Sequence, residues 1–140
     1  MHWYTPLVIW GFYHLACLLA VVLLWATRQI SHAGALELSD WFVSWRLREG
    51  TILLGIAEQF TRGRVLGMSI GLNVLVRGTA RDLMRQTAKH EECHCIQQLV
   101  LGPLMPALYL LFSLFLWARG KKYYLDNPFE AQARRYASRS

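Results

Sequence analysis

The chain has 140 residues, enough for one domain, and only 17% of them are charged, whereas soluble domains average about 25%. Its net charge of +6 does not indicate a nucleic-acid-binding protein, because the basic residues are scattered along the chain and no nucleic-acid-binding motif is present. Three cysteines, an odd number, do not make a disulfide framework. A membrane protein whose cations face anionic lipid headgroups accounts for this composition best.

The first predicted element is a transmembrane helix over Leu7–Thr27. These residues would form a helix of about 31 Å, which matches a hydrocarbon core roughly 30 Å thick. No Lys, Arg, Asp or Glu precedes Arg28. Ala33-Gly34-Ala35 resembles a signal-peptide cleavage site, but the apolar run lacks a basic segment before it and is too long. We therefore expect a retained anchor over residues 1–28 and a domain over residues 29–140, with His14 a hydrogen-bonded neutral side chain inside the span.

Short elements are expected in the middle of the chain. Ser39–Arg48 has the pattern of an amphipathic helix that rests either on lipid headgroups or on the domain core. Repeated glycines disfavour one continuous helix over Thr51–Val76. One or two short β-strands are expected there instead, at Val65–Ile70 and Leu72–Val76, where β-branched residues partly alternate with others.

The last third of the chain predicts three helices. Thr79–Leu101 shows apolar and polar residues recurring at spacings of three or four, and Gly102-Pro103 should end that helix. The apolar run 103–118 would be about 24 Å long, which is short for a span and suits a re-entrant, interfacial or core helix. A final helix should begin at Asn127, a good N-cap, with Pro128 at its first position. The fold class expected is therefore mainly α and membrane-associated.

The distribution of cations predicts the topology. If residues 103–118 crossed the membrane, the basic middle region and the basic tail would face opposite sides, which the positive-inside bias resists. We therefore expect one span, with the N-terminus outside and the domain in the cytoplasm.

The run His90-Glu91-Glu92-Cys93-His94 carries the chemistry. The two histidines are four residues apart on a predicted helix, so both imidazoles project from one face and can hold one metal ion. Glu91 is placed to reach a water molecule beside that ion and to take its proton. This is the HExxH pattern, whose spacing places two metal ligands and a general base on one helix.

The sequence here resembles the HExxH zinc metallopeptidases (zincins). The ordered set His90-Glu91-x-x-His94-x-x-Gln97, then Gly102-Pro103-Leu104, then Asn127-Pro128-Phe129-Glu130 resembles small bacterial membrane-associated proteins of zincin type, over about 50 residues from Arg85 to Tyr136. The resemblance implies Zn²⁺ held by His90 and His94, with Glu91 as general base. It also implies Glu130 as third ligand, as in the glutamate-ligand zincins, and a bacterial inner membrane as location.

Several readings of these residues stay open at the level of sequence. Cys93 is an additional candidate ligand that would close the site, because thiolate binds zinc strongly. Glu92 departs from the usual uncharged residue and could compete for metal. Glu130 could instead serve in a capping box at the start of its helix. Gln97 is either a plain polar position or a hydrogen-bond donor that supports the metal site.

Three functions follow from these alternatives. The first is a membrane-attached zinc metallopeptidase that hydrolyses a peptide or membrane-protein substrate, alone or as an oligomer. The second is a non-catalytic zincin-like membrane protein, with structural zinc or none, that binds a partner. The third is a metal-sensing or trafficking protein that uses His90, Cys93, His94 and Cys95.

Overall fold

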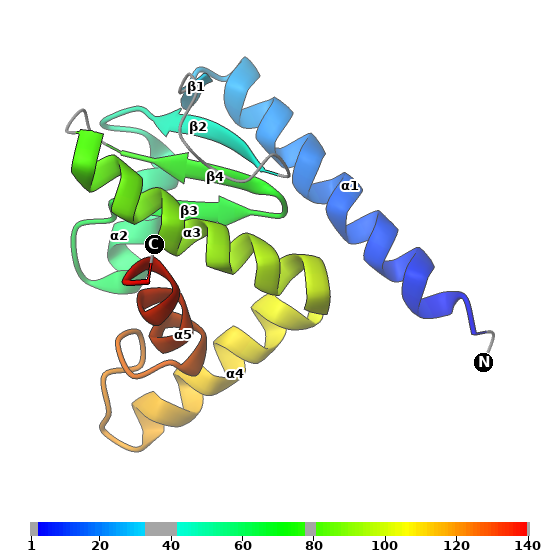
Figure 1. Ribbon diagram of the computed structural model, residues 1–140, viewed down its shortest axis with the longest axis vertical. Helices are drawn as coiled ribbons and strands as arrows, with labels where there is room; N and C mark the ends of the chain where they lie inside the picture. Colours follow the sequence, from blue (N-terminus) through cyan, green and yellow to red (C-terminus); the bar gives the residue numbers. More distant parts are fainter. Residues whose placement is uncertain (1–2, 33–41, 78–80, 140) are drawn as a thin grey trace.

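The computed structural model describes residues 3–32, 42–77 and 81–139, and helices predominate there over a small β-sheet (Figure 1). In chain order the elements are α1 (Thr5–Ala26), β1 (Ile30–His32), β2 (Val43–Leu47), α2 (Ile52–Thr61), β3 (Gly67–Ile70), β4 (Asn73–Val76), α3 (Arg81–Leu101), α4 (Leu104–Ala118) and α5 (Pro128–Ala137). The prediction of a mainly helical chain with an apolar N-terminal helix is confirmed at this level. The cleavage-site-like triplet at 33–35 lies outside the described residues.

Helix α1 is long and apolar enough to cross a membrane, and it alone among the described helices meets that test without a break. Its most apolar window has a mean hydropathy of 2.4, and only 6% of that window is buried. The second half of the helix nevertheless reaches the core, where Val21 is 1% exposed and packs with Ile30 and Leu54. Helix α1 is therefore both a candidate anchor and one wall of the folded domain.

The four strands of the described chain form one sheet in the order β1-β2-β4-β3. Strand β2 runs parallel to β4, and the outer strands β1 and β3 are antiparallel to their neighbours. Strands β3 and β4 form a hairpin whose two-residue turn begins at Gly71, with φ of +58°. A positive φ at the first turn position suits glycine and matches the right-handed twist of the strands. The prediction of strands at Val65–Ile70 and Leu72–Val76 is confirmed.

The predicted amphipathic helix over Ser39–Arg48 is wrong where the structure describes it. Residues Val43–Leu47 form β2, a strand paired on both sides, and residues 39–41 lie outside the described chain. Alternating apolar and polar residues suit a strand, and the two neighbouring strands satisfy the backbone hydrogen bonds of β2. Trp45 adds a hydrogen bond from its indole Nε1 to Asn73 Oδ1 on β4, at 3.0 Å.

Helix α2 was not predicted, because Gly55 lies within it. Thr51 caps its first turn through a hydrogen bond from Leu54 N. Leu54 then packs into the core, and Glu58 forms an ion pair with Arg77 at the end of β4. Tertiary packing therefore stabilises this helix despite the weak helix propensity of glycine.

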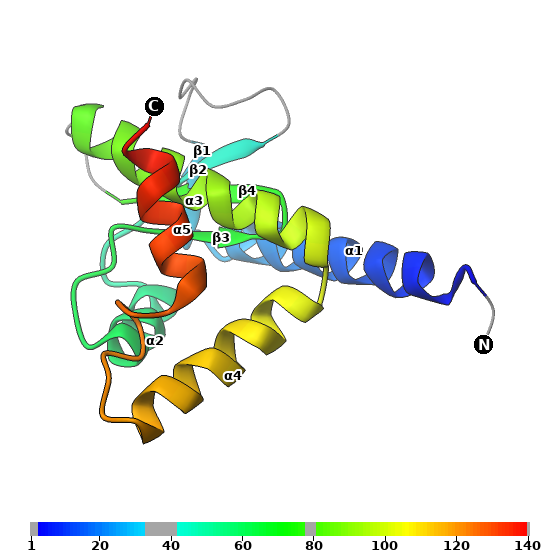
Figure 2. The same cartoon turned by 60° about the horizontal axis from the view of Figure 1, so that its bottom comes forward.

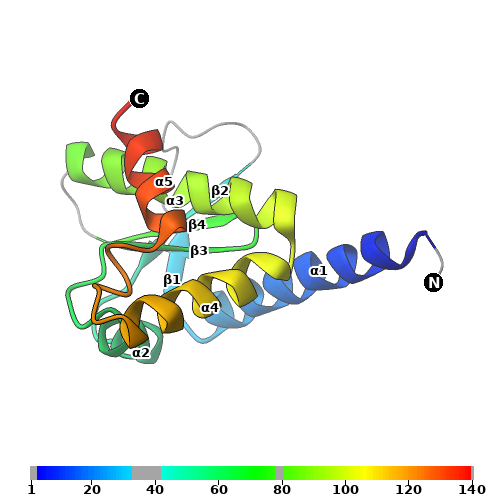
Figure 3. The same cartoon turned by 90° about the horizontal axis from the view of Figure 1, so that it is seen from below.

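The sheet lies between two helical layers. On one face, Val74 and Val76 pack with Ala88 and Cys95 of α3; on the other, Leu75 packs in the cluster that contains residues of α1 and α2. Figures 2 and 3 show α3 and α5 on the first side and α1, α2 and α4 on the second. The sheet therefore separates α3 from α2, whereas α4 lies directly against α3 and α5.

Helix α3 ends as predicted at Gly102, whose φ is +54°. The chain then turns by 114° into the apolar helix α4. A Cβ atom at Gly102 would lie only 2.8 Å from Cδ1 of Trp10, so α1 packs directly against this turn. The indole Nε1 of Trp10 also donates to Leu99 O at 2.7 Å.

A substitution at Gly67 tests how closely β3 approaches α3. A Cβ atom there would lie 2.6 Å from Thr87 Cγ2 and 3.1 Å from Leu75 O, so Gly67→Ala is expected to destabilise the fold by about 1–3 kcal/mol. Gly55→Ala is the matched control, because a Cβ meets nothing within 4 Å and helical alanine stabilises by about 0.5–1 kcal/mol. Denaturant unfolding measures both; equal effects of the two substitutions would contradict the close β3–α3 contact.

Candidate metal centre

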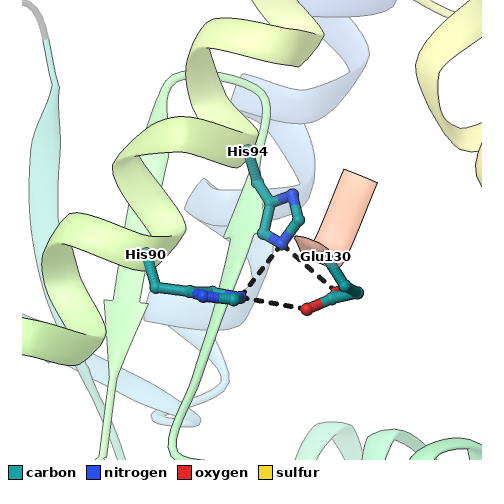
Figure 4. Close-up of side chains that lie close together, drawn as sticks. All are labelled: His90, His94 and Glu130. Carbon is teal, nitrogen blue, oxygen red and sulfur yellow. Dashed lines mark hydrogen bonds and ion pairs between the residues drawn. The ribbon is translucent and has the colours of Figure 1, made fainter. Parts of the chain in front are cut away.

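Three side chains from two distant helices meet at one point (Figure 4). His90 and His94 project from α3 one turn apart, and their Nε2 atoms are 3.2 Å from each other. The Glu130 carboxylate on α5 lies 3.1 Å from His90 Nε2 and 3.3 Å from His94 Nε2. The three ligand atoms are close enough to share one metal ion, and His94 and Glu130 are buried.

The imidazole of His94 is held in one orientation by Gln97. Gln97 Nε2 donates to Phe129 O at 3.3 Å and to Gln132 Oε1 at 3.0 Å, which directs Gln97 Oε1 toward the ring. His94 Nδ1–H donates to that oxygen at 2.8 Å. With the proton on Nδ1, the lone pair of Nε2 is free to bind a metal, the arrangement found around most metal-bound histidines.

Asn127 fixes α5 against α4. Its side chain accepts a hydrogen bond from Phe129 N at 3.1 Å, so the predicted N-cap is confirmed. Its Nδ2 donates to Tyr109 O and to Ser113 Oγ, and the residue is fully buried. The capping-box reading of Glu130 is wrong, because Asn127 N–H donates to Tyr124 O while the Glu130 carboxylate faces the histidines.

Two tyrosines lie beside Glu130, and of these Tyr109 was not expected from the sequence. The hydroxyl of Tyr109 on α4 donates to Glu130 Oε1 at 2.9 Å. Tyr124 borders a cleft that also reaches Glu130. Burial together with the charge of Glu130 raises the pKa of the Tyr124 phenol. A signal for Tyr109 was present: Tyr109 and Ser113 are polar side chains four residues apart on an otherwise apolar helix, which indicates a face turned toward polar partners.

Glu91 is buried directly beside this group. Burial raises the pKa of its carboxyl to about 7, because the charged form loses its water, and the two histidines only partly oppose that effect. The Glu91 side chain borders the cleft and lies close to Gly67. A Cβ atom added at Gly67 would lie 2.9 Å from Glu91 Cγ. A carboxyl group with a pKa near neutrality can both take and return a proton.

Glu92 and Cys93 point away from the three ligands. The Glu92 carboxylate accepts from Lys89 Nζ at 2.9 Å and from Tyr136 OH at 3.4 Å. Cys93 is buried toward α5, with its sulfur 3.8 Å from Gln97 Nε2, and it is not a member of the His-His-Glu group. Neither side chain is placed to compete for a metal held by that group.

A cleft of about 1240 Å³ leads to the ligand atoms. Strand β3 and helix α3 line it together with residues of α1, α2 and α4 and the chain that leads into α5. His90, Glu91, His94 and Glu130 all border this space. The candidate metal centre is therefore buried at its ligands yet accessible from one side.

The metal-free centre should make stability depend on pH. Burial acts to lower the pKa of His94, but its hydrogen bond with Glu130 and the charges of Glu91 and Glu130 outweigh this and raise it to about 9. Likewise, burial acts against ionised Glu130, but the two histidines hold its pKa well below the usual range.

Because the folded pKa of His94 exceeds its unfolded value, the stabilisation is complete below about pH 6.5 and is lost as the pH rises through about 9. We expect the metal-free protein to lose up to about 3 kcal/mol of stability over this window. Thermal unfolding in chelator measures it, and Glu130→Gln should flatten the profile. Stability that is constant or increases from pH 6.5 to 9 would contradict the pairing.

Two histidines one helical turn apart, completed by a carboxylate from a later helix, define a candidate three-ligand metal centre of His-His-Glu type. No protein-family model, no curated protein and no solved structure matches this chain. The class of the site therefore rests on its geometry.

Proposed function

We propose that this protein is a membrane-attached, zinc-dependent metallopeptidase of zincin type, which hydrolyses peptide bonds. The observation that carries the proposal is the meeting of His90, His94 and Glu130 at 3.1–3.3 Å, with Glu91 buried beside them. This is the ligand set and the general base that the HExxH resemblance implied.

The spacing of the ligand atoms fits zinc. Zinc takes nitrogen and oxygen ligands at about 2.0–2.2 Å in tetrahedral geometry, so two neighbouring ligand atoms lie about 3.3 Å apart. The separation of the two Nε2 atoms, 3.2 Å, is close to that edge length, and each Nε2 atom has one oxygen of the Glu130 carboxylate at 3.1 or 3.3 Å. Three protein ligands leave one of four positions for water or substrate, as in catalytic rather than structural zinc sites.

Zinc, when bound, supplies a Lewis acid that polarises a peptide carbonyl and acidifies a water molecule. Glu91 would take one proton from that water on a carboxylate oxygen as the water oxygen bonds to the carbonyl carbon, and would return the proton to the amine nitrogen as the C–N bond breaks. His94 and Glu130 stay fixed through Gln97 and Tyr109.

Two observations favour catalysis over a structural zinc site. Cys93, the candidate fourth ligand, lies toward α5 and not with the three ligand atoms. The cleft gives a substrate access to the place where the fourth ligand would bind. A structural site would need that position closed by a protein side chain.

The apolar helix α1 supports attachment to a bilayer. We propose that α1 is the span, with the N-terminus outside and the domain on the cytoplasmic side. All Lys and Arg residues lie at or after Arg28, and the positive-inside bias places them in the cytoplasm. Helix α4 has 15 residues, about 22 Å, and α3 and α4 together are bent by 114°, which suits a re-entrant pair rather than a second span.

The first experiment is elemental analysis of detergent-purified protein, followed by hydrolysis of fluorogenic peptides. We expect one zinc per chain, loss of hydrolysis in chelator and recovery on addition of zinc. A folded protein that binds no zinc, or that binds zinc with the same affinity after Glu130→Ala, would refute the proposed centre.

A further inference from the structure

Three apolar helices share one side of the molecule. In Figure 3, α1, α2 and α4 form the layer that lies opposite α3 and α5. Helix α1 is exposed and apolar along most of its length. Helix α2 exposes Ile52, Ile56 and Phe60, which follow each other at i, i+4 and i+8 and form a single stripe. The outer side of α4 is also apolar, with Leu111 62% exposed and Leu114 61% exposed.

These helices are joined to one another at their ends. The turn before α4 packs on Trp10 of α1. The start of α2 is tied to the end of α1, because Leu53 N donates to Gln29 Oε1 at 3.2 Å. The end of α2 is tied to the chain after α4, where Tyr123 OH donates to Phe60 O and the two rings are in contact. The three helices therefore form a closed frame rather than separate apolar patches.

Cations lie at the ends of the helices that form this frame. Arg28 follows α1, Arg62 and Arg64 follow α2, and Arg119 and Lys121 follow α4, all of them exposed. Apolar helices whose ends carry cations are complementary to a bilayer with anionic headgroups. The occupant that fits the outer side of the frame is therefore lipid.

The cleft that leads to the candidate metal centre has walls from all three framing helices. Tyr13 and Cys17 come from α1, Ala57 and Phe60 from α2, and Met105 and Leu110 from α4. The same space is bordered by His90, His94 and Glu130. The lipid-facing surface is thus continuous with the interior of the cleft.

We propose that the cleft receives an apolar peptide segment directly from the bilayer, so that the substrate class is a membrane-embedded protein. Cleavage of that segment rests on the proposed metallopeptidase function, but its binding does not. A peptide is the occupant, rather than a lipid acyl chain, because β3 borders the cleft and pairs only with β4 among the described strands. Its outward N–H and C=O groups can bind a peptide backbone, whereas an acyl chain offers no hydrogen-bonding partner.

Photocrosslinking in vesicles tests the proposal without requiring hydrolysis. The full chain carrying Glu91→Gln is reconstituted in phosphatidylcholine–phosphatidylglycerol vesicles with a biotinylated leucine–alanine transmembrane peptide of about 20 residues. Benzoylphenylalanine replaces Leu110, which lines the cleft, or in a matched control Leu111, which does not. Phe60 is a second cleft position, where the new side chain is close in shape.

We expect the transmembrane peptide to crosslink several-fold more from Leu110 and Phe60 than from Leu111. A charged, water-soluble peptide of the same length should not crosslink. Equal yields from Leu110 and Leu111, crosslinks to lipid alone from both cleft positions, or equal capture of the soluble peptide would each overturn the proposal. If the chain with Glu91 intact, assayed separately, shows no zinc-dependent hydrolysis while crosslinking is preserved, the peptidase function is removed and the membrane-facing binding site remains.

Discussion

Replacing Glu91 by glutamine is expected to lower zinc-dependent peptide hydrolysis by about 10²–10⁴-fold while the zinc content stays at one per chain. The amide has nearly the shape of the carboxylate but cannot accept a proton. Glu91 is not one of the three residues of the candidate metal centre, which are His90, His94 and Glu130. Its replacement should therefore leave zinc affinity almost unchanged. Initial rates and elemental analysis on the same preparations measure the two quantities.

Glu92→Gln provides the matched control for that experiment. The two glutamates are neighbours on α3 and both are buried, but Glu92 faces Lys89 and Tyr136 instead of the cleft. We expect Glu92→Gln to alter stability and to leave the hydrolysis rate within a few-fold of the original. Similar losses of rate in both variants would show that the first effect comes from damage to α3 and not from a missing base.

Removal of one metal ligand should have the second large effect. Glu130→Ala and His94→Ala are each expected to weaken zinc binding by more than about 100-fold, since changes in groups that merely support a ligand already cost 10–100-fold. Competition with a chromogenic chelator measures the affinity. Both variants should lose hydrolysis in parallel with zinc.

Two further variants calibrate that result. Tyr109→Phe removes only the hydrogen bond to Glu130, so its zinc affinity should fall by the smaller factor of about 10–100. Cys93→Ser should bind zinc as the unmodified protein does, because the thiol lies away from the ligand atoms. Loss of zinc in Cys93→Ser would instead place sulfur in the coordination sphere and favour a closed, structural site.

The helices around the candidate centre could be predicted because their signals are local. Asn127-Pro128 marks the start of α5, and Gly102-Pro103 marks the end of α3. The prediction that Glu130 lies beside the two histidines came from a family resemblance. Periodicity could not provide it, because Glu130 is at least 36 positions away from both histidines.

What the sequence could not provide was tertiary context. Strand β2 reads as an amphipathic helix until its two neighbouring strands are known, because both periodicities accommodate its few apolar residues. Helix α2 could not be predicted from the sequence because Gly55 has a weak helix propensity. In the fold, the packing of Leu54 outweighs that propensity. Gln98, which accepts hydrogen bonds from Tyr13 OH and Gly71 N, joins α1 to the hairpin in a way that no spacing rule indicates.

Under the proposed function, the hydrogen bonds from Asn127 to α4 would couple the lipid environment to the candidate metal centre. Asn127 holds α5 to Tyr109 O and Ser113 Oγ, so Glu130 follows any displacement of the helix whose outer side is apolar. If the protein binds zinc in a bilayer as proposed, we expect lipid or detergent that shifts α4 relative to α3 to change zinc affinity. By linkage, zinc must change the preference of the protein for that lipid by the same factor. Under the proposed function, zinc affinity would be a property of the protein together with its bilayer, and we expect its value to differ between detergent and vesicles.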